Sequence, residues 1–131
     1  MNSRYLITLL LIVCVLFTGC TTQSLEKPEQ ILKLIGDAVK ITEKAANEKD
    51  LKLAREVWTQ VSEYGVKAKE IGNKELADSL GKLASTYVYL VSYIESGDTL
   101  QLTNFQNCFD QAVSQLRKCV SNQKSLKMDK R

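Results

Sequence analysis

The sequence contains no histidine. Histidine is the usual general base at neutral pH and the commonest metal ligand, so its absence excludes Ser–His and Cys–His nucleophile pairs. Only six glycines occur, and they form no glycine-rich phosphate-binding loop. We therefore predict that the protein is not an enzyme and holds no cofactor and no metal ion. The acidic residues fall at predicted helix starts or on polar helix faces, where they are solvated, as with Glu29, Glu43, Glu56, Glu63 and Asp78.

Proline and an excess of one charge are also nearly absent. The single proline is Pro28, and the period-two alternation that marks β-strands is hardly visible, so a sheet is not expected. The chain has 18 basic and 15 acidic residues, a formal net charge of +3. A nucleic-acid-binding domain would show a concentrated basic face. We therefore predict no nucleic-acid partner.

The N-terminus has the organisation of an export signal. Residues 1–4 carry one positive side chain, Arg4, and residues 5–17 form an uncharged apolar run. A short charged segment followed by an apolar one is typical of a signal peptide. The run is shorter than the roughly 20 residues that a membrane-spanning helix needs. Export with removal of the segment is therefore favoured over a membrane anchor formed by the segment itself.

The junction after the apolar run is Leu16-Phe17-Thr18-Gly19-Cys20. It resembles the lipobox of bacterial lipoproteins, the substrates of signal peptidase II, in which small residues precede an obligatory cysteine. Phe17 stands where lipoboxes usually have leucine, and it is likewise large and apolar. The resemblance implies that Cys20 is lipidated and that cleavage falls between Gly19 and Cys20, with Thr18 and Gly19 leaving that bond accessible. The alternative is an incidental cysteine beside a signal anchor.

Lipidation would place the mature chain on a membrane without spanning it. One acyl chain binds a membrane only weakly, whereas two or three hold stably. Thr21 stands where an aspartate usually signals retention at the inner membrane, which implies the outer membrane in a cell with two membranes. In other cells, the resemblance implies the outer face of the cell membrane. Cys14 lies inside the signal and would be lost with it.

The chain divides into four segments. Residues 1–19 are the predicted signal peptide, and residues 20–27 are a lipidated polar tether that reaches about 20–25 Å when extended. Residues 28–120 form the predicted helical domain. Residues 121–131, "SNQKSLKMDKR", are basic and lack an apolar stripe, so we predict a disordered tail with at most weak attraction to anionic surfaces.

Apolar residues recur at helical spacing in four stretches of residues 28–120. Helices of about 20 residues with short connections pack antiparallel, so the sequence predicts an all-α, four-helix up-down bundle. A short helical-repeat scaffold is the alternative. Expected helix ends are Pro28 at a first turn, Asp50 and Asn73 as N-caps, Gly72 and Gly97 as C-terminal residues, and a capping box at Asp98/Gln101 or Thr103/Gln106. The apolar stripe of the second helix includes the sole tryptophan, Trp58.

Two cysteines, Cys108 and Cys119, remain in the mature chain, both in the fourth helical stretch. Their spacing places the two backbones about 16 Å apart in a helix, whereas a disulfide requires roughly 4.4–6.8 Å. Three outcomes stay open: buried free thiols, which we favour, a disulfide-linked homodimer through either cysteine, or a break in the helix.

The third helical stretch is apolar almost all the way round in its second half. Tyr89 lies about 180° around the helix from the core position Leu80, and Tyr93 follows one turn later. Paired exposed tyrosines are favoured at interfaces, so Tyr89 and Tyr93 are a candidate partner-binding site. The alternative is a central helix that is covered on both faces.

The sequence thus predicts a lipid-anchored helical module outside the cytoplasm. The expected role is binding another protein of the bacterial cell envelope, in assembly, exclusion or immunity. A structural or scaffold lipoprotein, dimeric through a cysteine, and a carrier of a small apolar ligand are the alternatives.

Overall fold

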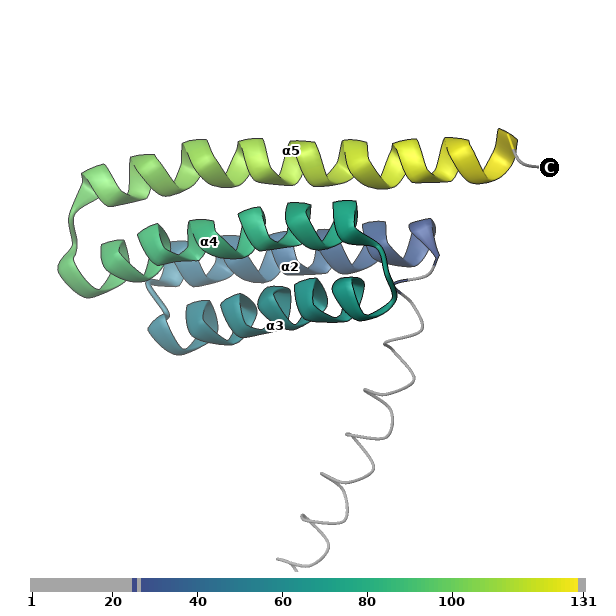
Figure 1. Ribbon diagram of the computed structural model, residues 1–131. Helices are drawn as coiled ribbons and strands as arrows, with labels where there is room; N and C mark the ends of the chain where they lie inside the picture. Colours follow the sequence, from purple (N-terminus) through teal and green to yellow (C-terminus); the bar gives the residue numbers. More distant parts are fainter. Residues whose placement is uncertain (1–24, 26, 130–131) are drawn as a thin grey trace, which may run out of the picture.

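The computed structural model describes Leu25 and residues 27–129. Within these residues the chain forms four helices joined by short turns, so the prediction of an all-α four-helix bundle is confirmed (Figure 1). Consecutive helices run antiparallel, and α4 lies between α3 and α5. Contacts of α2 with α3 and α5 close the bundle. The helices are α2 (Pro28–Glu48), α3 (Leu51–Glu70), α4 (Lys74–Ser96) and α5 (Thr99–Asp129).

The turn between α2 and α3 follows the predicted caps. Pro28 occupies the first turn of α2, where its missing N–H leaves no intrahelical bond unmade. Lys49 ends α2 in the left-handed conformation, with φ 51°. The Oδ1 of Asp50 accepts a hydrogen bond of 3.1 Å from the backbone N–H of Leu53, which confirms Asp50 as the N-cap of α3.

The turns on either side of α4 are also as expected. Gly72 and Gly97 have φ values of 81° and 74°, which glycine adopts without steric cost. The backbone N–H of Asn73 donates to the carbonyl of Ala68 at 2.9 Å, and its Oδ1 accepts from the N–H of Leu76 at 3.2 Å. Asn73 therefore closes α3 and caps α4.

The start of α5 differs in detail from the expected capping box. The Oδ1 of Asp98 accepts from the N–H of Leu100 at 3.0 Å, not from the N–H of Gln101. Thr103 lies within the helix, where its Oγ1 donates to the carbonyl of Thr99 at 3.2 Å. The side chain of Asp98 thus caps the helix alone, and the second proposed box at Thr103 and Gln106 is wrong.

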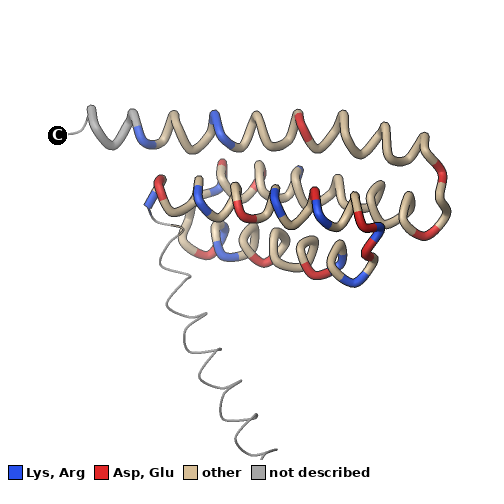
Figure 2. Tube along the Cα trace, turned by 180° about the vertical axis from the view of Figure 1, so that it is seen from behind, with Lys and Arg blue, Asp and Glu red and all other residues tan. Residues whose placement is uncertain are grey.

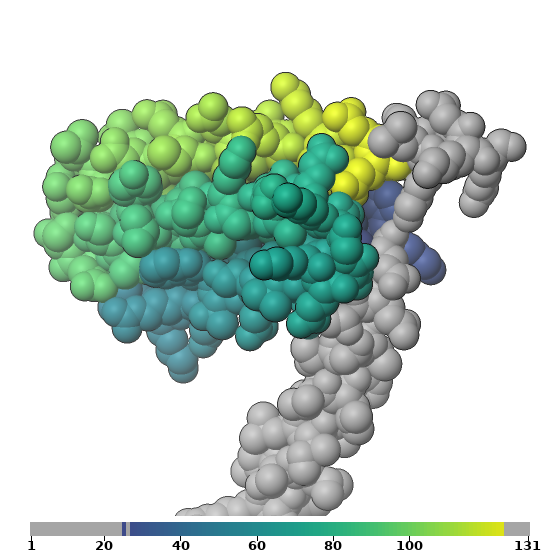
Figure 3. Space-filling view, viewed as in Figure 1, coloured from purple at the N-terminus to yellow at the C-terminus, as the bar shows by residue number. Residues whose placement is uncertain are grey.

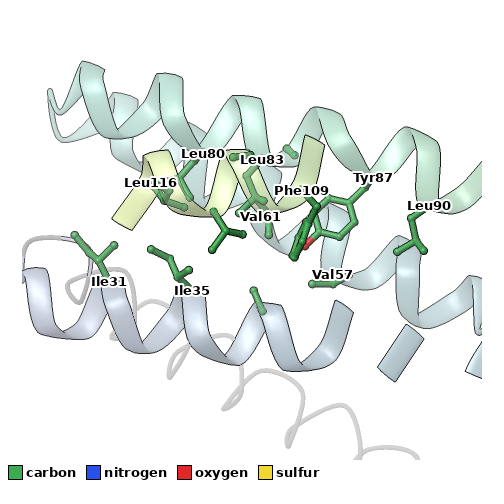
Figure 4. Packing of buried hydrophobic residues seen from close by; sticks show 14 of the residues in the cluster. Ile31, Ile35, Val57, Val61, Leu80, Leu83, Tyr87, Leu90, Phe109 and Leu116 are labelled. Atoms are coloured by element: carbon green, nitrogen blue, oxygen red, sulfur yellow. The ribbon is translucent and has the colours of Figure 1, made fainter. Parts of the chain in front are cut away.

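The core centres on Tyr87, which is fully buried among residues from all four helices (Figure 4). Its ring centroid lies 6.0 Å from that of Phe105 and 5.9 Å from that of Phe109. Its hydroxyl forms a 2.7 Å hydrogen bond with the Oγ1 of Thr42, which in turn donates to the carbonyl of Ala38 at 2.6 Å. This buried polar contact joins α2 to α4 and fixes the tyrosine in one position.

Two expectations about the core change. Trp58 is only partly buried and packs at the edge of the core. The buried stripe of α3 runs through Val57 and Val61, and Trp58 lies about 100° around the helix from Val57. Leu25 has 2 % of its surface exposed and belongs to the core cluster, although the sequence assigned it to the polar tether.

Residues 121–129, which the sequence assigns to a disordered tail, are part of helix α5. Helix α5 continues to Asp129 because residues 99–129 contain neither glycine nor proline and the extension is fastened to the bundle. Val120 is fully buried, and Gln123 exchanges two hydrogen bonds with Asn73, of 2.9 and 2.8 Å. These contacts with the rest of the bundle stabilise the helical conformation of the segment, and the local pattern of "SNQKSLKMDKR" does not reveal them.

Candidate functional site

The residues of the lipobox lie outside the part of the chain that the structure describes. The lipidation of Cys20 and the cleavage beside Thr18 and Gly19 therefore stay predictions. Leu25, the first described residue, is buried and follows Cys20 by five positions. Leu25, which the sequence places in the tether of residues 20–27, is therefore packed into the domain.

The tether leaves the domain at one end of the bundle. The start of α2, the turn between α3 and α4, and the C-terminal part of α5 all lie at this end, and the other two turns lie at the opposite end (Figure 1). We call the first the tether end and the second the far end. A lipid on Cys20 would therefore bring the tether end, and not the far end, close to a membrane.

The tether end is held together by polar contacts between distant segments. The paired side-chain amides of Asn73 and Gln123 connect the α3–α4 turn to α5. Each side-chain amide donates one hydrogen bond to the other and accepts one from it, so the N–H and the carbonyl oxygen that face each other are both paired. Lys124 lies 3.7 Å from Glu29 at the start of α2, an exposed ion pair that contributes little because water and salt screen it.

A shallow groove of about 610 Å³ runs between α3 and α4, and its lining includes Gly72 in the turn that joins them. Small residues let the two helices approach: a Cβ on Gly65 would lie 3.6 Å from the Cβ of Leu80 and 3.8 Å from the carbonyl of Ala77. Lys69 and Lys74 stand at its rim. Figure 3 shows the face of the bundle on which α5, α4 and α3 lie side by side.

A second groove, of about 640 Å³, lies between α2 and α5 and is mixed in character. Val39, Phe109 and Val113 form its apolar floor, while Glu43 and Arg117 are among its charged residues. Charges of both signs share this groove, so it does not select an anionic or a cationic ligand.

The predicted tyrosine pair does not form an exposed surface. Tyr93 is buried, with 9 % of its surface exposed, and Tyr89 is partly buried against the core. Their neighbours Thr86 and Leu90 are also buried. The reason is that α4 packs against α3 on one side and α5 on the other, so the face that stays exposed is the one with Lys82, Ser85 and Val88. Tyr93 is therefore not exposed as predicted, Tyr89 is exposed only in part, and α4 is central without being covered on every face.

Among the residues that the structure describes, Cys108 and Cys119 are free thiols on the continuous helix α5. Cys119 is buried, with 4 % of its surface exposed, whereas Cys108 is partly buried in a polar groove between α4 and α5 beside Lys82 and Gln111. An internal disulfide would require a break in α5, which the structure does not have. The favoured expectation of buried thiols holds fully for Cys119 and partly for Cys108.

We expect the two thiols to differ in reactivity. Burial raises the pKa of the Cys119 thiol, so less reactive thiolate forms at pH 8, and the site is also closed to the reagent. Titration of the native chain with a chromogenic disulfide should modify Cys108 quickly and Cys119 only after unfolding. Fast modification of both thiols would contradict the expected difference in reactivity. A dimer that appears on non-reducing gels and is lost on reduction would show that the thiols are not free.

Two further features are defined by the residues that the structure describes. No cluster of three or more acidic or cysteine side chains has the arrangement of a metal site among them. None of the helices α2–α5 combines the length and the apolar character needed to cross a membrane.

Comparison with known proteins yields no relative. No family model, no curated protein and no solved structure matches the chain. The function has to be inferred from the residues and their arrangement.

Proposed function

We propose that the protein is a non-catalytic, lipid-anchored module that stands on a bacterial membrane outside the cytoplasm and binds another envelope protein. The outer membrane is the proposed location in a cell with two membranes, and the outer face of the cell membrane in other cells. The lipid on Cys20 is the proposed anchor.

One observation carries this proposal: Thr18-Gly19-Cys20 ends an apolar segment with the pattern of an export signal, and the packed domain includes Leu25, five residues later. A lipidated cysteine needs no spanning helix, since two or three acyl chains hold a protein stably on a membrane. The bundle supplies a rigid body with exposed helix faces, and the absence of histidine favours binding over catalysis.

The anchor is tested by metabolic labelling with a clickable palmitate analogue. The wild-type chain should carry the label and lose residues 1–19, and Cys20→Ala should abolish both the label and the processing. Cys14→Ala is the matched control, because Cys14 lies within the segment that is removed. Persistent labelling of Cys20→Ala, or loss of label from Cys14→Ala, would show that the lipid is not on Cys20.

A further inference from the structure

A lipid on Cys20 would keep one end of the domain close to a membrane. Five residues from Cys20 to Leu25 span at most about 18 Å when fully extended. The 21 residues of α2 extend about 31 Å from the tether end to the far end. With Leu25 packed into the core, the tether end stays within reach of the lipid surface, while the far end of an upright domain lies well beyond it.

The two ends differ in charge. In Figure 2, Lys and Arg lie on the C-terminal half of α5, and Asp and Glu lie at the α4–α5 turn. At the tether end (residues 27–33, 66–79 and 117–124) basic residues outnumber acidic ones: Lys27, Lys33, Lys67, Lys69, Lys74, Arg117, Lys118 and Lys124 against Glu29, Glu70, Glu75 and Asp78. At the far end (residues 43–56 and 90–103) acidic residues are in excess: Glu43, Glu48, Asp50, Glu56, Glu95 and Asp98 against Lys44, Lys49, Lys52 and Arg55.

We propose that the tether end is a docking surface for anionic lipid headgroups, and that the domain stands on the membrane on Lys69, Lys74 and Lys124. This inference rests on the proposed lipidation of Cys20. The three lysines are exposed and come from the end of α3, the start of α4 and the C-terminal part of α5. Two exposed apolar side chains also lie at this end: Ile71, in the turn between two of the lysines, and Val66 near the end of α3, which are 44 % and 59 % exposed.

The charge difference orients the domain because it acts only at short range. Basic residues near an anionic leaflet are attracted to it, on the order of a fivefold gain in local binding per lysine, and the attraction decays within about 8 Å at physiological salt. The tether keeps this end near that range. Glu70 and Glu75 flank two of the lysines, and Glu29 lies 3.7 Å from Lys124; these carboxylates reduce the attraction without reversing its sign, whereas the acidic far end is repelled.

The test is amine footprinting of the full chain purified from cells, with any lipid that the cells have added retained. The chain is reconstituted into vesicles of phosphatidylcholine alone or of phosphatidylcholine with phosphatidylglycerol, acetylated briefly, and analysed by mass spectrometry. Acetylation of Lys69, Lys74 and Lys124 should fall by roughly fivefold on the anionic vesicles and recover at high salt. Lys44 and Lys52, exposed at the far end, should react equally on both. Equal reactivity at both ends, or protection at the far end, overturns the proposal.

A matched pair of variants separates the surface from the anchor. Lys69→Glu with Lys74→Glu should abolish the protection of Lys124 on anionic vesicles, while Lys44→Glu with Lys52→Glu, the same charge change at the far end, should preserve it. The mass of the N-terminal peptide in the same samples reports whether Cys20 carries lipid. Lipid without lysine protection overturns the docking surface alone. Protection without lipid overturns the anchor alone, and the absence of both overturns both.

Discussion

Replacement of Tyr87 by alanine should lower the free energy of unfolding by about 3–5 kcal/mol, because it removes a fully buried ring from the centre of the core. The ring packs against Phe105 and Phe109, whose own centroids lie 5.0 Å apart, so the cavity would open within an aromatic cluster. Urea unfolding of the chain lacking residues 1–20, followed by circular dichroism, measures the loss. Such a loss is a large part of the stability of a domain of this size.

Tyr87→Phe is the matched control for the hydroxyl. It keeps the ring and removes the hydrogen bond to Thr42, which still donates to the carbonyl of Ala38. The expected cost is about 1 kcal/mol, typical of one neutral hydrogen bond. If Tyr87→Phe costs as much as Tyr87→Ala, the polar contact and not the ring volume dominates at this position.

The same residue makes stability fall at high pH. Burial raises the pKa of Tyr87 from 10.0 to about 12. The folded-state pKa lies above the unfolded one, so the protonated hydroxyl contributes its full stability below pH 10 and this contribution is lost as pH rises from 10 to 12. The loss amounts to roughly 2–3 kcal/mol. Because Tyr87→Phe lacks the ionisable group, the difference between the two chains across this pH range isolates the effect.

Val120→Asp should unfold the domain or destabilise it by several kcal/mol at neutral pH. Val120 is fully buried at the point where the sequence pattern predicts that the fourth helix ends. A carboxylate at this site would be taken out of water without a basic partner in the core, and an unpaired buried charge costs several kcal/mol.

The neighbouring substitution, Ser121→Asp, controls for charge in α5. Ser121 is exposed on the same turn, so a carboxylate there remains solvated and should change stability by less than about 0.5 kcal/mol. Thermal melting of the two variants side by side makes the comparison. Equal melting temperatures for Val120→Asp and Ser121→Asp would mean that the C-terminal part of α5 does not pack on the bundle.

The helix boundaries could be predicted from the sequence because the caps act locally. The side chains of Asp50 and Asn73 each accept a hydrogen bond from a backbone N–H three residues later, and Gly97 adopts the positive φ that ends α4. The apolar stripes likewise place Leu80, Leu83 and Tyr87 in the core, where the structure has them.

The features that could not be predicted depend on contacts between distant segments. Leu25 is the one apolar residue in a polar stretch and gains its burial only from the assembled bundle. The extension of α5 depends on the amide pair between Asn73 and Gln123, fifty positions apart. Tyr93 is buried because α4 occupies the central position, and periodicity within one helix does not reveal how many neighbours that helix has.

The arrangement of the helices also has a consequence for the rate of folding. The most extensive packing is between consecutive helices, α3 with α4 and α4 with α5, which short turns bring together. A chain dominated by such local contacts has a low contact order, and helical bundles of this kind fold in microseconds to milliseconds. The closing contact of α2 with α5 joins segments far apart in sequence and carries the greater loop-closure entropy. We therefore expect the α3–α4–α5 hairpins to form first, with α2 and the adjoining Leu25 docking last.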